Sequence, residues 1–182
     1  MTSWDVIINP VTGETVTFLE RTPERLTLDL EIPPGCPAIV AHQHAWTEHF
    51  TVRRGRLDIT VAGSVHRLGP GDELSVGDLV HQPVNTTADT TVVTVVCCPG
   101  AAAERGLRAA FGLARDGGIS PTGRPRDLLS LALLSDKGQF RIDGPPRVVW
   151  RPMIAGLALT ARLLGRRRVV ERYWPPDLAR PR

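Results

Sequence analysis

The strongest signal in this chain of 182 residues is the stretch from Gly35 to Gly55, which reads GCPAIVAHQHAWTEHFTVRRG. Side chains two apart on a β-strand point to the same face, so His42 and His44 can direct two imidazoles toward one point. Glu48 follows after a predicted break in the strand. If the chain folds back there as a hairpin, the Glu48 carboxylate reaches the same point.

A third imidazole, His81, comes from a later predicted strand. Three neutral imidazole nitrogens and one carboxylate suit a borderline divalent ion. We therefore predict that His42, His44, Glu48 and His81 bind one divalent transition metal, which can be Fe, Mn, Co, Ni, Cu or Zn. An octahedral ion on four protein ligands keeps two positions open, as a catalytic site requires.

The rest of the first 98 residues is predicted to form short strands. The clearest is 25–32, where Leu and Ile alternate with polar residues. Ten such segments separated by turn residues favour a closed β-barrel or a two-sheet jelly roll. They are 4–8, 15–19, 25–32, 38–44, 48–52, 57–61, 64–68, 73–76, 79–83 and 90–98.

Two spacings resemble the signature motifs of the cupins. The first motif matches Gly35-x6-His42-x-His44-x3-Glu48-x6-Gly55, and the second matches Gly71-x9-His81-x3-Asn85. The second departs from the usual pattern, because Val76 and Asp78 stand where cupins usually have Pro and Gly. The resemblance implies a mainly β fold, an RmlC-like jelly-roll barrel, with His42, His44, Glu48 and His81 as metal ligands. His49 is the alternative ligand in the motif variant with a longer gap.

More narrowly, the layout is similar to actinobacterial type-2 single-domain cupins with a helical extension after the barrel. Three segments carry this likeness: the start at Asn9, the segment 111–116 and the region 144–165. Cupins include dioxygenases, isomerases, decarboxylases and polyketide cyclases, together with binding and sensor modules. We expect a metal-dependent oxidoreductase of dioxygenase type that acts on a small organic molecule. The alternatives are a metal-assisted cyclase or isomerase of secondary metabolism, and a non-catalytic small-ligand-binding or sensor module.

Several further residues are candidates for the site. Glu48 is also the candidate catalytic base. Trp46, Phe50 and Asn85 are the candidates for substrate contact, although Phe50 also fits the barrel core and Asn85 also fits a turn. Each metal-binding His should donate its other ring N–H to a second acceptor, for which Gln43, Asp78 and backbone carbonyls are available.

The composition changes near Pro99. Residues 1–98 hold 6 Arg and 12 Asp or Glu, a net charge of −6, whereas residues 99–182 hold 15 Arg, one Lys and 7 acids, a net charge of +9. We therefore predict a barrel over 1–98 and a basic helical extension over 99–182. Helices are expected at 101–115, at 127–137 with Asp127 as N-cap, and at 147–167.

Three surroundings are open to the helix at 147–167: the barrel, a homodimer partner and, because arginines flank its apolar stripe, a membrane surface. We favour packing against protein. We expect no nucleic-acid partner, because the loop between the first two helices is too long for a helix-turn-helix motif.

The cysteines and the N-terminus predict a cytoplasmic protein. Three cysteines cannot form a closed disulfide framework, and strand alternation places one of Cys97 and Cys98 inward and the other outward. No signal-peptide pattern begins the chain, and no stretch reaches the ~20 apolar residues of a membrane span.

Overall fold

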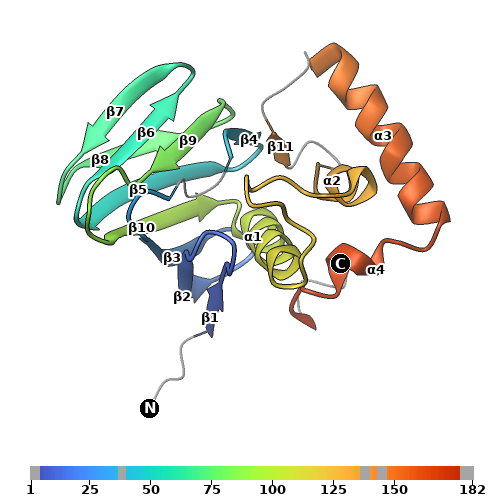
Figure 1. Cartoon of the computed structure of the whole chain (residues 1–182), viewed down its shortest axis with the longest axis horizontal. Helices are drawn as coiled ribbons and strands as arrows, with labels where there is room; N and C mark the ends of the chain where they lie inside the picture. Colours follow the sequence, from blue (N-terminus) through green and yellow to red (C-terminus); the bar gives the residue numbers. More distant parts are fainter. Residues whose placement is uncertain (1–4, 37–39, 136–139, 143–146, 177–182) are drawn as a thin grey trace.

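The computed structural model describes residues 5–36, 40–135, 140–142 and 147–176. Two antiparallel sheets face each other, and the helices gather at one end of them (Figure 1). The six-stranded sheet has the order β1-β2-β3-β10-β5-β8, with the strands β1 (Asp5–Ile8), β2 (Thr15–Arg21), β3 (Leu26–Ile32), β10 (Thr91–Cys98), β5 (Thr47–Arg54) and β8 (Glu73–Val76). The five-stranded sheet has the order β11-β4-β9-β6-β7, with β11 (Phe140–Ile142), β4 (His42–His44), β9 (His81–Val84), β6 (Leu57–Val61) and β7 (Ser64–Leu68).

The core lies between the sheets because the inward positions of the strands are apolar. On β10 every second side chain is buried, from Thr91 to Cys97, while Cys98 is exposed. The predicted inward and outward cysteines are thus Cys97 and Cys98. The mainly β jelly-roll fold with a helical C-terminal part is confirmed.

The first helix, α1 (Gly100–Arg115), packs against the six-stranded sheet (Figure 1). Its Ala103 and Phe111 belong to the same buried cluster as the sheet side chains. The buried carboxylate of Glu104 accepts hydrogen bonds from Arg21 of β2 at 2.6 Å and from Arg108 at 2.7 Å. Arg108 also pairs with Asp5 of β1. The division into two domains at residue 98 stays a prediction.

The ends of the helices follow their capping residues. Backbone N–H groups of Gly117 and Gly118 bond back to Ala114 and Leu113, which ends α1 as expected. At the start of α2 (Leu128–Ser135), both carboxylate oxygens of Asp127 accept backbone N–H bonds, so Asp127 is the N-cap. The predicted continuation of this helix over 136–137, and residues 38–39 of the predicted strand 38–44, lie outside the described residues.

The long C-terminal helix is shorter than predicted. The helix α3 (Arg147–Leu163) is terminated by Gly165, whose φ of +70° allows the N–H of Arg166 to bond to the Ala161 carbonyl. This 6→1 bond is the Schellman motif, and the prediction of a helix to 167 overlooked the glycine. A separate short helix, α4 (Arg168–Glu171), follows.

The strand β11 was not expected at all. It has three residues and pairs with β4, about 100 residues earlier in the chain, with Phe140 opposite His44 and Ile142 opposite His42. The strands β4 and β9 begin later than predicted, at His42 and His81. Among the described residues, no helix is long and apolar enough to cross a membrane.

Candidate functional site

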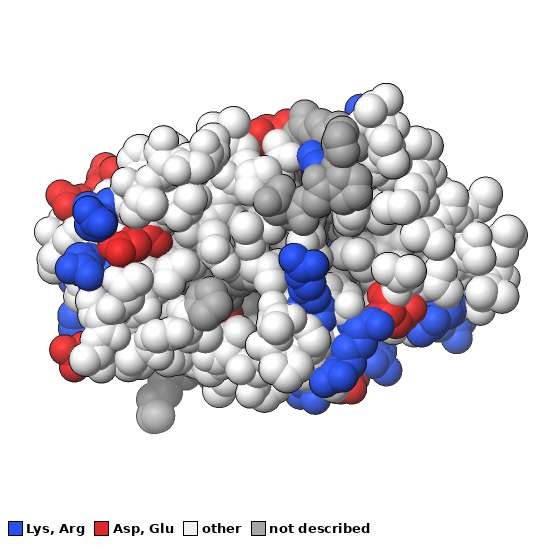
Figure 2. All heavy atoms as spheres, turned by 45° about the horizontal axis from the view of Figure 1, so that its top comes forward, with Lys and Arg blue, Asp and Glu red and all other residues white. Residues whose placement is uncertain are grey.

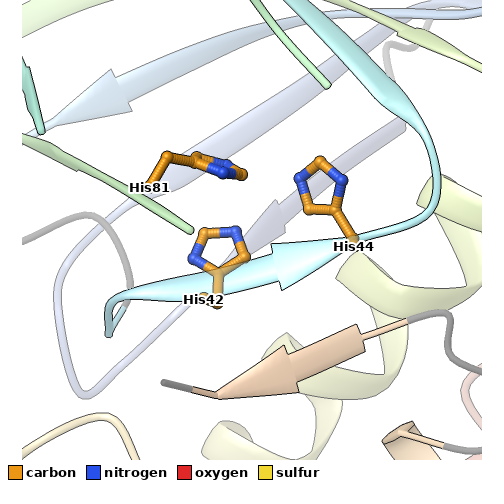
Figure 3. A group of neighbouring side chains, drawn as sticks. All are labelled: His42, His44 and His81. Carbon is orange, nitrogen blue, oxygen red and sulfur yellow. The ribbon is translucent and has the colours of Figure 1, made fainter. Parts of the chain in front are cut away.

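Three histidine side chains converge inside the barrel (Figure 3). His42 and His44 come from β4, and His81 comes from the neighbouring strand β9, where it pairs with His42. One ring nitrogen of each residue lies within 4.8 Å of the others, and all three side chains are buried. The convergence of His42 and His44 follows from strand alternation, as the sequence pattern indicates.

Each of the three rings is held by a backbone carbonyl. Nδ1 of His42 lies 2.8 Å from the Val40 oxygen, Nδ1 of His44 lies 2.8 Å from the Trp46 oxygen, and Nδ1 of His81 lies 2.9 Å from the Leu79 oxygen. A carbonyl oxygen can only accept, so each Nδ1 carries a proton and each neutral ring has a bare Nε2. Backbone carbonyls therefore accept the ring N–H of each histidine, for which the side chains of Gln43 and Asp78 were also candidates.

Gln43, one of the two side chains considered for that role, bonds elsewhere. Gln43 Nε2 donates to the backbone oxygen of Asp78 at 2.7 Å, and Gln43 Oε1 accepts from Arg141 of β11. These bonds connect β4 to the loop before β9 and to β11. Gln43 thus supports the strand that carries His42 and His44 without contacting their rings.

Glu48 reaches the group from the opposite sheet. It lies on β5, and its Oε1 and Oε2 are each 3.3 Å from an Nε2, the first from His44 and the second from His81. The indole N–H of Trp46 donates to Glu48 Oε1 at 3.0 Å. The four predicted ligands are therefore brought together, three by one sheet and one by the other.

Burial and charge set the ionisation of these groups in opposite directions. Burial and the neighbouring charge of His81 lower the pKa of His42 to about 3, so this imidazole is neutral near pH 7. Burial also disfavours a charged His81, but the negative charge of Glu48, whose Oε2 lies 3.3 Å from His81 Nε2, outweighs this and raises the pKa of His81. Burial alone would raise the pKa of Glu48, yet His44 and His81 hold it well below its ordinary value.

The nitrogens that face Glu48 lack proper partners. His44 Nε2 and His81 Nε2 are buried and make no hydrogen bond with any described residue. In the neutral rings, each of these nitrogens turns a lone pair toward a carboxylate oxygen, which is unfavourable. A divalent cation between the rings and Glu48 removes this conflict, and imidazole nitrogens with a carboxylate are suitable ligands for it. The residues present therefore fit a metal.

The other predicted site residues divide into two groups. Trp46 and Phe50 are buried and line a cavity beside the histidines, and Trp46 stacks on His44 at 4.0 Å between ring centroids. Asn85 does not line it; its amide donates to three backbone oxygens, among them that of Ile32, and so closes a turn. His49 faces away from the group and bonds to Ser75, so it is not a candidate ligand in this structure.

The cavity has about 80 Å³ of space for water-sized molecules, and it is predominantly apolar. No Lys or Arg side chain is among the described residues that line it. Its wall includes residues of both sheets and of α1, such as Val16, Leu28, Val95, Leu107, Phe111 and Phe140. The site therefore combines one polar cluster with an apolar enclosure.

Two residues of this cavity were missed by sequence reasoning. Phe140 of β11 stacks on His42, with ring centroids 5.2 Å apart, but the three-residue strand carries no usable periodicity. Glu14 is buried in the wall, and its carboxylate accepts a hydrogen bond from Thr12 at 2.6 Å. Burial raises the pKa of Glu14 to about 8, against the effect of its bonds to Thr12 and Asn9. A Glu after a tight turn does not by itself predict a buried acid.

The comparison with family models agrees with the fold. The family model that matches is the cupin domain, over residues 28–97. A sugar phosphate isomerase of the cupin superfamily from Silicibacter pomeroyi has 21% identity and a TM-score of 0.48, with 53% of this chain and 71% of that chain covered. KdgF from Halomonas sp. has 21% identity and a TM-score of 0.46, covering 53% and 86%. An RmlC-like cupin from Shewanella frigidimarina has 19% identity and a TM-score of 0.47, covering 51% and 82%. None of the curated proteins compared matches the chain.

Proposed function

We propose that this chain, whose residues 28–97 match the cupin-domain model, is a mononuclear metal enzyme, an oxidoreductase of dioxygenase type, acting on a small and largely apolar organic molecule. The observation that carries the proposal is the pair of bare, buried nitrogens of His44 and His81 that face the Glu48 carboxylate. Each contact between an imidazole nitrogen and the carboxylate needs a positive charge, which a proton on the ring or a metal ion between the two groups supplies.

In this proposal the metal is held by His42, His44, Glu48 and His81. A redox-active divalent ion supplies a Lewis acid and a site at which dioxygen and substrate meet. The side chains and backbone of the protein orient the ligands of this ion and exclude water from it. The backbone oxygens bound to Nδ1 fix the tautomers, Trp46 fixes Glu48 Oε1, and the apolar wall excludes water.

The cavity wall narrows the class of substrate. A phosphate or a sugar acid normally meets an Arg or Lys side chain, and none lines the described wall. An apolar molecule fits the wall if it presents an oxygen atom to the metal. Glu14, which keeps its proton near neutral pH, is placed to donate a hydrogen bond to a second oxygen of such a molecule.

A second candidate is a metal-assisted cyclase or isomerase, and one observation favours it. Glu48 lines the cavity, and the two histidines keep it ionised, so it can accept a proton from a bound substrate. In this case Glu48 is both a ligand and the catalytic base. A binding or sensor module remains the third candidate, and it needs no open position on the metal.

The test is the metal content of untagged protein purified without chelators. We expect about one ion per chain in the wild type and in a His66→Ala control, because His66 is an exposed residue of β7. A His42→Ala/His81→Ala variant should lose it. Iron, manganese, copper or nickel favours the oxidoreductase, which dioxygen uptake with candidate substrates then checks. Zinc favours the cyclase or isomerase, and absence of metal after reconstitution refutes both.

Two further assignments belong to the same proposal. A homodimer and a cytoplasmic location are predictions from the sequence, and light scattering and cell fractionation test them. Neither one is required by the arrangement of the four ligands.

A further inference from the structure

The helix α3 has two faces with different surroundings. One face packs on α2, where Ile154 and Ala158 of α3 form a buried cluster with Ala132. The opposite face carries large apolar side chains that are exposed: Val148 and Leu163 at 80% and Leu159 at 56%. The helix forms the outer edge of the molecule (Figure 1), so a flat surface can approach this second face.

This outward face is almost free of polar groups. At 100° per residue, one half of the helix surface presents Val148, Val149, Pro152, Met153, Ala155, Gly156, Leu159, Thr160 and Leu163. Thr160 is the single polar side chain of this set, and its hydroxyl donates to the Gly156 carbonyl at 3.0 Å within the helix. A Cβ added at Gly156 would meet no atom within 4 Å, so the middle of the face is open.

Arginines outnumber acids along the border of this face. The segment 147–168 contains six Arg and no Asp or Glu. Exposed Arg151 and Arg162 lie along one side of the apolar surface, and three more follow the end of α3 at 166–168. Arg166 pairs with Asp127 and Arg167 pairs with Glu171. Figure 2 shows a largely uncharged right-hand end of the molecule, with blue and some red side chains gathered along its lower edge.

This distribution of charge distinguishes between two partners for the outward face of α3, a second copy of the chain and a lipid surface. A second copy that presented the same face would bring the arginines of one α3 against those of the other, and no acid of that segment could balance them. An anionic lipid surface takes up the apolar side chains and at the same time attracts the excess of positive charge in the segment 147–168. We propose that the outward face of α3 docks the protein onto membranes that contain anionic lipids.

Cosedimentation with vesicles tests this. The wild type should pellet with vesicles of phosphatidylcholine and phosphatidylglycerol, and far less with phosphatidylcholine alone. Added salt should weaken the binding, because the arginines contribute through exposed charge. A Leu159→Glu/Leu163→Glu variant should bind on the order of tenfold less, since both side chains leave the lipid. Val65→Glu on β7 is the matched control, because Val65 and Leu159 are both 56% exposed.

Three results overturn the proposal. The first is equal sedimentation with and without anionic lipid, and the second is equal binding by the double variant and by Val65→Glu. The third is a wild-type dimer in light scattering that the double variant converts to a monomer, because a second copy then covers the face. The single variant Leu163→Glu, at a position that is 80% exposed, repeats each comparison if circular dichroism shows that the double variant does not fold.

Discussion

Trp46 contacts the candidate metal ligands in three ways. Its ring stacks on His44, its indole N–H donates to Glu48, and its backbone oxygen accepts from His44 Nδ1. Only the second contact depends on the indole nitrogen, so a substitution that keeps an aromatic ring isolates it. A substitution at Trp46 can therefore separate the effect of its hydrogen bond to Glu48 from the effect of its ring packing.

We predict that Trp46→Phe lowers the metal affinity about tenfold, because loss of a hydrogen bond that orients a ligand typically has this effect. Competition with a chelating dye measures it. Trp150→Phe is the control, since Trp150 packs in the cluster between α2 and α3. An affinity that is unchanged in Trp46→Phe would show that Glu48 needs no orientation by the indole.

Glu14 gives a prediction about pH. Its pKa is raised from 4.5 to about 8 in the folded chain, so between these values the folded state keeps a proton that the unfolded state has lost. The stability that this proton contributes is fully present below the unfolded pKa and is lost as the pH rises through about 8. From about pH 5 to about pH 8, wild type should lose roughly 3 kcal/mol of unfolding free energy relative to Glu14→Gln.

Denaturant titration of both proteins at these two pH values measures this difference. Groups other than Glu14 titrate equally in the two proteins, so they cancel in the comparison. A difference in unfolding free energy that stays constant across the range would mean that Glu14 is ionised in the folded protein.

At the residue scale, features set by the local sequence pattern were predictable, whereas features set by contacts with distant parts of the chain were not. The positions of His42, His44 and Glu48 follow from strand alternation and one turn, so the sequence indicates them directly. The role of Asn85 in a turn was also foreseeable. The burial of Glu14 depends on strands and a helix that are distant in sequence, and no local pattern carries that information.

At the scale of elements, the start of α1 is fixed by close packing against the loop before β3. A Cβ at Gly100 would lie 2.4 Å from the backbone carbon of Arg25 and 2.6 Å from the Leu26 nitrogen. Helix propensity alone favours alanine over glycine by up to about 1 kcal/mol. The contact with backbone atoms outweighs that preference, because the backbone cannot move aside cheaply.

Gly100→Ala should therefore lower the unfolding free energy by roughly 2 kcal/mol. Gly156→Ala in α3 should raise it by about 0.5–1 kcal/mol, because nothing lies near a Cβ there and propensity acts alone. Denaturant unfolding of the two variants checks the opposite signs. A gain in stability for Gly100→Ala would mean that α1 can shift away from the sheet.

Two elements, β11 and the end of α3, were predicted poorly, and the reasons differ. The strand β11 exists because the edge of β4 is available to it, and a three-residue segment shows no periodicity of its own. The end of α3 had a local cause, the glycine at 165, which the apolar spacing on both sides of it concealed.

At the scale of the molecule, the candidate site connects the two sheets. His42, His44 and His81 belong to the five-stranded sheet, whereas Glu48 belongs to the six-stranded sheet. A metal held by all four side chains is therefore a cross-link through the core of the barrel. Binding should stabilise the whole fold, because the unfolded chain does not keep these four residues together.

We predict that a metal ion at about 100 times its dissociation constant adds roughly 2.7 kcal/mol, which raises the melting temperature of metal-free protein by about 5–11 °C. His81→Ala should show almost no rise, and His66→Ala should behave as wild type. Glu48→Ala should show less than half of the wild-type rise, because it removes the one ligand from the six-stranded sheet. Differential scanning calorimetry measures all four proteins, and an equal rise in Glu48→Ala would mean that the ion is held by one sheet alone.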